Sequence, residues 1–395
     1  MGESSRADDD TEVGQRGHAT SAGAVVQAGR DAVVTVEHHV HHRGASVLPV
    51  RALLISLACA TGLVLVLRGG VFVWAAPCVV VLVALLLLWP TRRGTTAGQV
   101  FLVMSAFTQK YWVLDFLQRL HHSLDRKGLD LVLKVPDRDH DASALAHDLR
   151  RVLTARSGYL GGFVWPTELG RSRPDLVEFC TELALPVVFT DMEPFEDESE
   201  YPANTAFVGY RGGDLGEEAG RWLVGHLRRR GVRRPHVLIV ASHEHPDRQN
   251  RCADLLRAGF GGISITIDDT CDFRRSRAYD AVQAHIRSSG TPLDAVFCTS
   301  DDMALGAVDA IRANTSQHTS DTVVVGVDGN PEARSLIAAA VSPLRATVVQ
   351  DSHRLAECAV EVLQKMLERR HTAKRTILKP EVFQAPWTTG IDLGA

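Results

Sequence analysis

Short apolar segments alternate with amphipathic segments over residues 99–390, and this alternation constrains the fold more than any other feature. The apolar segments are expected strands, at 100–104, 129–135, 162–164, 186–189, 236–241, 264–267, 295–297, 322–327 and 345–348. The amphipathic segments are expected helices, the clearest at 111–127, 145–155, 215–230, 250–258, 278–288 and 303–313. Strands that alternate with helices form parallel sheets covered by helices on both faces. The pattern therefore predicts an α/β protein, with two doubly wound lobes rather than one large sheet.

Composition allows such a core and excludes some partners. The chain has 395 residues, of which 45% are hydrophobic, enough for more than one domain. Its 43 basic and 47 acidic residues give a net charge of -4, so no overall footprint for nucleic acid is present. The seven cysteines lie at wide, irregular spacings that predict neither a disulfide framework nor a zinc site.

Residues 1–47 are polar, rich in Gly, Ser, Asp and His, and we expect them to be mostly disordered. Within them, residues 24–36 contain two β-branched runs around a Gly-Arg-Asp turn, the pattern of a short hairpin. A hairpin this small does not fold alone. We therefore hypothesise that it pairs with copies of itself or with a protein partner.

Residues 48–92 predict a transmembrane helical hairpin in a lipid bilayer. The runs 52–67 and 69–91 carry no charge, and about 20 apolar residues cross a bilayer core. Basic residues precede the first run and follow the second, at Arg43, Arg51, Arg92 and Arg93. Positive charges tend to stay inside, so we expect a two-pass protein of the cell membrane with both ends and the soluble domain in the cytoplasm.

Polar side chains recur where the expected strands end. Ser105, Asp191, Ser300 and Asp328 each follow an apolar strand segment. In open parallel sheets, ligands bind beyond the carboxyl ends of the strands. Aromatic and basic side chains complete a site suited to a hydroxyl-rich ligand: Tyr111, Trp112, Phe273 and Arg251.

Four stretches in this region carry a family resemblance. They are Val103 to Trp112, Phe297 to Ala307 with its Ser-Asp-Asp-Met-Ala-Leu-Gly motif, Val323 to Glu332 with Val-Gly-Val-Asp-Gly, and Ala346 to Gln350. In order and content they resemble the type I periplasmic binding proteins, in particular the ribose-binding, sugar-binding branch. That family shares its fold with the effector domains of lactose-repressor-type regulators. The resemblance runs from about residue 99 to about residue 385.

The resemblance implies a pocket between two hinged lobes. The first lobe would comprise 99–209 and 351–379, and the second 210–350 and 380–390, with crossings near Gly209, Gln350 and Lys379. The implied pocket residues are Ser105, Gln109, Tyr111, Trp112 and Asp191 from the first lobe, Arg251, Phe273, Ser300 and Asp328 from the second, and Gln350 at the hinge. Two positions depart from a ribose-type pocket. Met192 stands where an Arg is usual and Ser300 where an Asn is usual, which leaves a pentose, a hexose, another polyol or a nucleoside-like ligand open.

Two histidine clusters invite a metal-site interpretation that we do not favour. His38–His42 is better explained as a polar segment next to the membrane, and His243–Asp247 as a variable loop after a strand. The Asp301 and Asp302 pair is better explained by a cap, with Asp301 opening the helix at Met303. We predict no metal and no cofactor.

The function that best fits these features is a non-catalytic, membrane-anchored sensor that closes around a sugar-like ligand. No nucleophile elbow, phosphate loop or dinucleotide fingerprint indicates an enzyme. A substrate-binding component of a carbohydrate importer is the alternative, and it requires the domain outside the cell. A transcription regulator is a weaker alternative, because residues 1–47 contain no helix-turn-helix pattern. The sequence predicts no nucleic-acid partner.

Overall fold

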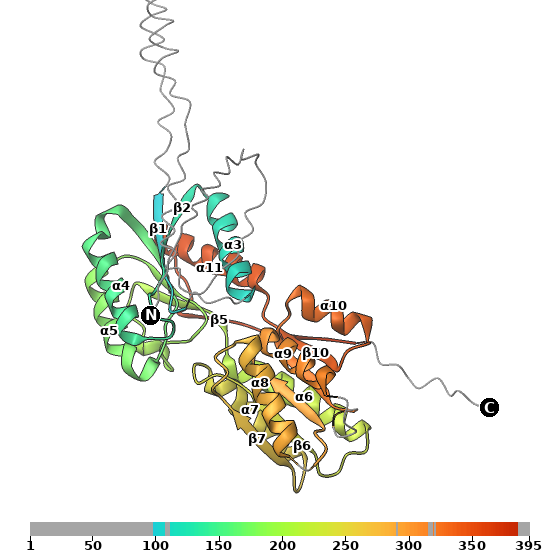
Figure 1. The fold of residues 1–395 in the computed structure, drawn as a ribbon. Helices are drawn as coiled ribbons and strands as arrows, with labels where there is room; N and C mark the ends of the chain where they lie inside the picture. Colours follow the sequence, from blue (N-terminus) through green and yellow to red (C-terminus); the bar gives the residue numbers. More distant parts are fainter. Residues whose placement is uncertain (1–97, 107–110, 290, 315–318, 320, 386–395) are drawn as a thin grey trace, which may run out of the picture. The chain divides into compact units, whose positions relative to one another are not determined.

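The computed structural model describes residues 98–106, 111–289, 291–314, 319 and 321–385. These residues form two six-stranded sheets, each surrounded by its own helices (Figure 1). The sequence prediction of an α/β protein with two parallel-sheet lobes is confirmed. We call the part built on the first sheet lobe 1 and the part built on the second lobe 2.

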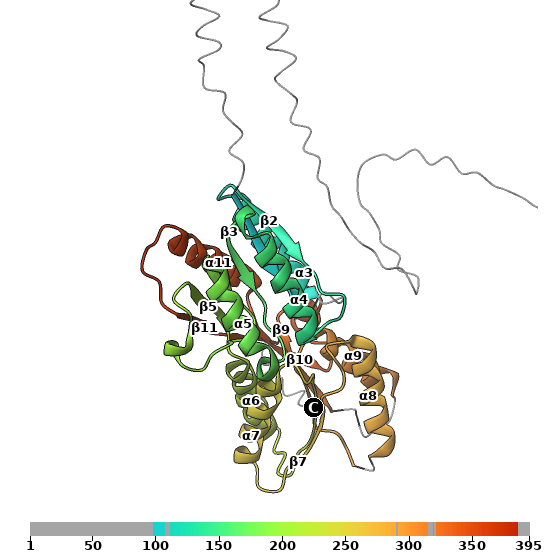
Figure 2. The ribbon, with the colours of Figure 1, turned by 90° about the vertical axis from the view of Figure 1, so that its left-hand side faces the viewer.

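Lobe 1 contains a sheet in the order β11-β5-β4-β3-β1-β2. All its neighbouring strands are parallel. The strands are β1 (Gly98–Val103), β2 (Leu129–Lys134), β3 (Tyr159–Val164), β4 (Val187–Phe189), β5 (Thr205–Tyr210) and β11 (Arg375–Leu378). The helices are α3 (Tyr111–Asp125), α4 (Ala142–Thr154), α5 (Leu169–Leu183) and α11 (Ser352–Leu367). Figures 1 and 2 show α4 and α5 together beside this sheet, and α3 packs against α11.

Lobe 2 repeats this architecture in the order β12-β10-β9-β8-β6-β7. Only the β10–β12 pair among the described strands is antiparallel. The strands are β6 (His236–Val240), β7 (Ser264–Asp268), β8 (Ala295–Cys298), β9 (Val323–Asp328), β10 (Leu344–Val349) and β12 (Glu381–Gln384). The helices are α6 (Gly212–Arg229), α7 (Pro246–Gly259), α8 (Arg275–Ser288), α9 (Asp301–Ala313) and α10 (Pro331–Ala339). Helix α6 pairs with α7, and α8 pairs with α9 (Figure 2).

The cores form because the central strands are apolar on both faces. Phe101, Phe163, Phe189 and Phe207 in lobe 1, and Phe297 in lobe 2, are fully buried. Burying one such side chain contributes about 1.5–3 kcal/mol to folding. These rigid sheets hold the loops at the carboxyl ends of the strands.

The chain passes between the two sheets three times: after β5, after β10 and after β11. The connections lie next to Gly209, Gln350 and Lys379, where the resemblance placed the crossings. Three short connections of this kind leave each lobe intact and permit a hinge between them.

The sequence analysis missed three strands and misplaced one cap. It did not predict β5, β11 or β12, which complete the two sheets. Helix α9 begins at Asp301, and the side-chain cap is Ser300, whose Oγ accepts a hydrogen bond from the Met303 amide at 3.3 Å. Asp301 instead is buried and accepts from the Asn330 amide and the Thr347 hydroxyl, both at 2.7 Å.

The predicted tail at 1–47 and the predicted transmembrane hairpin at 48–92 lie outside the described residues. Within the ranges that the structure describes, no helix has the length and apolar character needed to span a bilayer.

Candidate functional site

An enclosed cavity lies where the carboxyl ends of the strands of both lobes meet. Its volume is about 40 Å³. Lobe 1 contributes five of the lining residues, lobe 2 contributes six, and the β10–α11 connection contributes Gln350. The lining consists of Trp112, Val113, His140, Trp165, Asp191, His245, Arg248, Phe273, Ser300, Asp302, Asp328 and Gln350.

Lobe 1 presents an aromatic wall to this cavity. Trp112 is the second residue of α3 and stacks on Phe116, with 5.6 Å between the ring centroids. Trp165 follows β3 and meets Trp112 edge to face at 5.7 Å. The indole N–H of Trp112 donates to the Gln350 carbonyl at 2.8 Å, which ties this wall to the hinge. Fixed indole faces of this kind cover the C–H face of a ring or bind a cation.

Asp191, which follows β4, is the carboxylate of the lobe 1 wall. It accepts hydrogen bonds from the indole N–H of Trp165 and from His245 of lobe 2, whose Nε2 lies 3.4 Å away. Burial opposes the charged form, but His245 and Arg248 outweigh it and hold the pKa of Asp191 below its ordinary value. Burial, followed by the charge of Arg248, also lowers the pKa of His245. The contact is therefore a hydrogen bond from a neutral imidazole to a carboxylate at neutral pH.

Arg248 projects from α7 into the cavity and is buried. Its Nη1 donates to the Thr299 carbonyl at 3.0 Å and its Nη2 to the Gln350 side chain at 3.5 Å. Gly216 of α6 allows this placement, because a Cβ there would lie 2.1 Å from the Arg248 carbonyl oxygen. The buried Nε has no hydrogen-bond partner in the protein.

Asp328 ends β9 and faces Arg248 across the cavity. Its carboxylate accepts from the Gln350 side-chain amide at 2.9 Å and from the Asp301 amide at 3.4 Å. Burial, together with the Asp302 carboxylate, raises the pKa of Asp328 to about 7 even though Arg248 favours the charged form. This site therefore holds a carboxyl group that changes its charge near neutral pH.

Backbone strain accumulates around the cavity. His140, Asp191, Phe273 and Asp328 have φ angles of 55°, 67°, 59° and 117°, a region that non-glycine residues seldom adopt. Such conformations cost about 1–3 kcal/mol each and concentrate at ligand-binding sites. Four strained residues around one cavity support a functional role for it.

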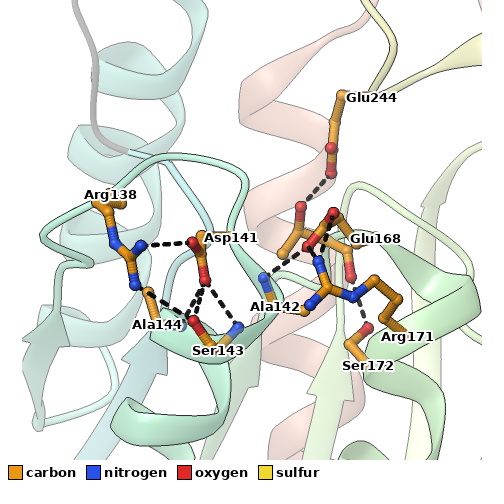
Figure 3. A network of polar contacts seen from close by, with 10 residues as sticks. Arg138, Asp141, Ala142, Ser143, Ala144, Glu168, Arg171, Ser172 and Glu244 are labelled. Carbon is orange, nitrogen blue, oxygen red and sulfur yellow. Dashed lines mark hydrogen bonds and ion pairs between the residues drawn. The ribbon is translucent and has the colours of Figure 1, made fainter.

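Contacts between the lobes close the cavity on one side. Glu244, in the β6–α7 loop of lobe 2, accepts from the Thr167 hydroxyl at 2.6 Å and lies 3.5 Å from His140 Nδ1, both in lobe 1. Figure 3 shows Glu244 reaching toward the start of α5, where Glu168 accepts from the Ala142 amide at 2.8 Å. The Glu244 carboxylate thus joins the loops that begin α4 and α5 to lobe 2.

A second, larger cavity of about 890 Å³ adjoins the first and shares His140, Asp191 and His245 with it. Loops of both lobes line it, and Met192 and Glu244 belong to its wall. We call it the outer cavity.

The structure brings most of the predicted site residues together. The residues that line the enclosed cavity, as expected, are Trp112, Asp191, Phe273, Ser300, Asp328 and Gln350. Ser105 is buried at the end of β1, with no hydrogen-bond partner for its hydroxyl, and Tyr111 is 45% exposed. Neither lines the enclosed cavity. Gln109 lies outside the described residues.

The assignment of Arg251 to the pocket was wrong. Its guanidinium lies on the exposed side of α7 and pairs with Glu217 of α6 at 2.7 Å. Arg248 is three residues earlier, in the first turn of α7, and this end of the helix borders the cavity together with His245. Both arginines lie near the start of the same helix, so the sequence alone does not show which of the two side chains reaches the cavity.

The sequence analysis also missed His140, Trp165, His245 and Asp302. Trp165 follows an expected strand directly, so its position carried a usable signal. His245 lies in the loop that we interpreted as an ordinary variable connection. Within the described ranges, no group of three or more metal-ligating side chains is present there or elsewhere.

Two lobes with parallel sheets, three crossings and a cavity between strand ends define the type I periplasmic-binding-protein fold. A family model, described as a periplasmic binding protein domain, matches residues 175–371. The chain is 26% identical over 208 residues to a putative rhizopine-binding protein of Rhizobium meliloti, an alignment that covers 51% of this chain and 64% of that protein. These matches support the family that the sequence motifs indicated.

Solved structures match the fold over a larger share of the chain. The myo-inositol binding protein of Caulobacter, bound to myo-inositol, has a TM-score of 0.63 and 21% identity, and the match covers 74% of this chain and 94% of that one. A solute-binding protein of Actinobacillus succinogenes with bound D-allose has a TM-score of 0.63 and 16% identity, covering 73% and 97%. At such identities the likeness concerns the fold. By sequence, the chain spans 27% to 64% of the length of the first curated relatives it matches.

Proposed function

We propose that this protein binds a small, hydroxyl-rich ligand, a sugar or a polyol, in the enclosed cavity and does no chemistry on it. The observation that carries the proposal is the composition of the cavity wall, in which indole faces from lobe 1 oppose Arg248, Asp328 and Gln350 at lobe 2 and the hinge. Aromatic faces with a few convergent polar groups are typical of sites for small polar ligands. Carboxylates and guanidinium groups pair with hydroxyl groups through two hydrogen bonds at once.

The ligand acts by closing the lobes. Its groups contact Trp112 and Asp191 on one side and Arg248 and Asp328 on the other only when the lobes are together. A ligand shifts an equilibrium only by its difference in affinity for the two states, and contacts to both walls supply that difference. The interlobe bonds of Glu244 and His245 add to the closed state.

The names of the relatives support this ligand class. They include D-allose-binding, ribose import binding and D-galactose binding proteins, and a putative rhizopine-binding protein. The solved structures that share the fold include one with bound D-allose and one with bound myo-inositol. We infer from them that the ligand has the size of a monosaccharide or a cyclitol. The 40 Å³ cavity then opens slightly to admit it.

A ligand screen tests the proposal. The full chain, purified in detergent, is heated with individual pentoses, hexoses, cyclitols, linear polyols, nucleosides and their amino derivatives. A ligand that binds only the folded state stabilises it by about 2.7 kcal/mol when its concentration is a hundred times its Kd, and it therefore raises the melting temperature. Stabilisation by one of these compounds, lost in Asp328→Ala, is the expected result. No stabilisation by any compound would refute the proposed function.

We propose further that the protein is anchored in the membrane by residues 48–92 and acts as a sensor with its binding domain in the cytoplasm. The charge distribution around the two apolar runs supports this orientation. An importer component is the second candidate, favoured by the names of the solute-binding relatives. It needs the domain on the outer side.

Accessibility labelling separates sensor from importer. Cys180 and Cys298 are buried, so a cysteine introduced at the exposed Ser335 is the better probe. A membrane-impermeant maleimide should label Ser335→Cys only after the cells are opened. Labelling in intact cells would favour the importer component and refute the cytoplasmic sensor.

A further inference from the structure

Strand β2 forms an open edge of the lobe 1 sheet. It is the last strand in the sheet order, so among the described strands it pairs only with β1. Helix α3 lies beside it (Figures 1 and 2). An unpaired edge offers a row of backbone N–H and C=O groups to another chain, and proteins usually protect such edges with charges, bulges or covering segments. The edge of β2 is therefore a place where a further strand can add to the sheet.

The side chains of β2 are mostly apolar. Its sequence is Leu-Asp-Leu-Val-Leu-Lys, and Val135, which follows it, is 38% exposed. The three leucines pack against the core that β2 shares with α3, and each keeps part of its surface accessible. Burial of accessible apolar surface is the main favourable contribution to most protein association. The edge therefore has apolar surface that a partner would bury.

Helix α3 extends this apolar surface. Leu114 is 53% exposed, and Leu117, almost one turn further along, is half-buried. Both are turned away from Asp115, whose carboxylate accepts from the Ser352 hydroxyl of α11. Helix α11 contacts β3, β4 and β5, whereas α3 contacts β2. The side of α3 that faces away from α11 is therefore the side of the open edge.

The backbone of β2 has a defined outer side. The Lys134 carbonyl accepts from the Met104 amide at 3.0 Å, so Lys134 directs its backbone groups toward the β1 side. Alternate residues of a strand direct their N–H and C=O groups to opposite sides. Leu131 and Leu133 therefore direct theirs to the open edge.

One antiparallel register with a second copy suits both the backbone and the side chains. When two β2 strands pair about Val132, Leu131 of each copy lies opposite Leu133 of the other, and these form the hydrogen-bonded pairs. Asp130 then lies opposite Lys134 of the second copy, once on each side of the two-fold axis. Opposite charges across a ladder stabilise it, and like charges destabilise it. A register shifted by two residues separates Asp130 from Lys134, and parallel pairing in register sets like charges against each other.

We propose that the protein forms a two-fold dimer through β2 and α3 of lobe 1, in which the two lobe 1 sheets join into one. The occupant of the edge is a second copy, because β2 is complementary in charge to itself in the antiparallel register. The predicted membrane anchor at 48–92 precedes β1 closely in the chain, and anchoring in one bilayer would raise the effective concentration of two copies. Trp112 of α3 and His140 after β2 line the enclosed cavity, so the elements of this interface also form the binding site.

Disulfide trapping tests the register on the full chain in detergent. Val132→Cys places its thiol at the two-fold axis, opposite the same thiol of the second copy, at a distance that a disulfide can bridge. Mild oxidation should convert most of this variant to a cross-linked dimer on a non-reducing gel, and the unsubstituted chain gives the background from the native cysteines.

Asp130→Cys is the matched control for the trapping experiment. In the proposed register its two thiols lie four residues apart along the ladder, about 13 Å, so this variant alone should not cross-link. A mixture of Asp130→Cys and Lys134→Cys should cross-link. Equal cross-linking of the Val132→Cys and Asp130→Cys variants, or no cross-link in Val132→Cys, would overturn the inference.

Sedimentation measures the association itself. The full chain should be a dimer, and Asp130→Lys should raise its dissociation constant about tenfold or more, because like charges then meet twice across the ladder. Asp254→Lys, at an exposed position of α7 in lobe 2, is the charge-matched control and should leave the dissociation constant unchanged. A monomeric chain would contradict the inference. So would a dimer that Asp130→Lys does not weaken, since its association would then lie elsewhere, as in residues 24–36.

Discussion

The two lobes share an architecture but present different walls to the cavity. Lobe 1 offers the indoles of Trp112 and Trp165, with Asp191 already bonded to one of them. Lobe 2 offers the guanidinium of Arg248 and the carboxyl group of Asp328, which both line the cavity. The difference indicates a division of roles. We propose that lobe 2 recognises the polar groups of the ligand and that lobe 1 closes over it with apolar faces.

From this comparison we expect the largest loss of ligand affinity when a residue of the lobe 2 wall is substituted. Arg248→Ala should weaken ligand binding about 100-fold or more, because truncating one partner of a buried charge network costs about 2–5 kcal/mol. Calorimetry measures the loss. The matched control is Arg251→Ala on the same helix, whose exposed pair with Glu217 is worth at most about 1 kcal/mol of stability and touches no cavity residue. Equal losses in both variants would contradict the assignment of Arg248.

The second prediction concerns the pH dependence of folding stability in the absence of ligand. The pKa of Asp328 is raised in the folded state to about 7, by burial first, so the folded protein holds this proton more tightly than the unfolded chain. The contribution of this proton to the free energy of unfolding is therefore full below about pH 4. On the order of a few kcal/mol of it is lost as the pH rises through 7.

Urea unfolding at intervals between pH 4 and pH 8 measures this loss. Asp328→Asn should flatten the curve between pH 4 and pH 7, because the amide does not ionise. Burial and then the charge of Asp328 raise the pKa of Asp301, so the difference between the two curves reports this coupled pair. Identical curves for the two proteins would show that its charge is compensated in the folded state.

A substitution in the lobe 1 wall should weaken ligand binding less. Trp112→Ala removes an indole face and the hydrogen bond to the Gln350 carbonyl, and should weaken binding about 30-fold. Trp222→Ala is the control, since Trp222 donates to Gln384 on lobe 2 and does not line the cavity. If Trp112→Ala weakened binding more than Arg248→Ala, the division of roles between the lobes would be reversed.

The smallest effect is expected at the contact between the lobes. Glu244→Gln keeps an acceptor for the Thr167 hydroxyl but removes the charge beside His140. This should weaken the contact between the lobes by about 1 kcal/mol. The affinity should fall three- to tenfold. Small-angle scattering should show a larger radius of gyration without ligand. A ligand affinity that does not change would mean that the bridge adds nothing to closure.

Much of the site in lobe 2 was predictable because its residues follow strands. Ser300, Asp328 and Gln350 come at or directly after the ends of β8, β9 and β10, and sheet geometry brings such ends to one edge. The same logic identified Asp191 after β4. His140 and His245 were not predictable in this way, because they reach the cavity from loops whose paths no local pattern determines.

The missed strands have a similar explanation. Strand β5 contains Gly209 between Val208 and Tyr210, which weakens the strand pattern, although every residue of β5 is buried. Strands β11 and β12 are four residues each and sit at the outer edge of their sheets. Short edge strands are stabilised by pairing with a neighbour that lies far away in the chain.

The amino-acid sequence by itself determined the two parallel-sheet lobes, because apolar strands and amphipathic helices impose their periods locally. It also determined which carboxylates end the strands. Only the tertiary structure decided that the first turn of α7 meets the cavity, and so selected Arg248 over Arg251. It alone placed His140, Glu244 and His245 between the lobes, since contacts across a hinge join residues a hundred positions apart.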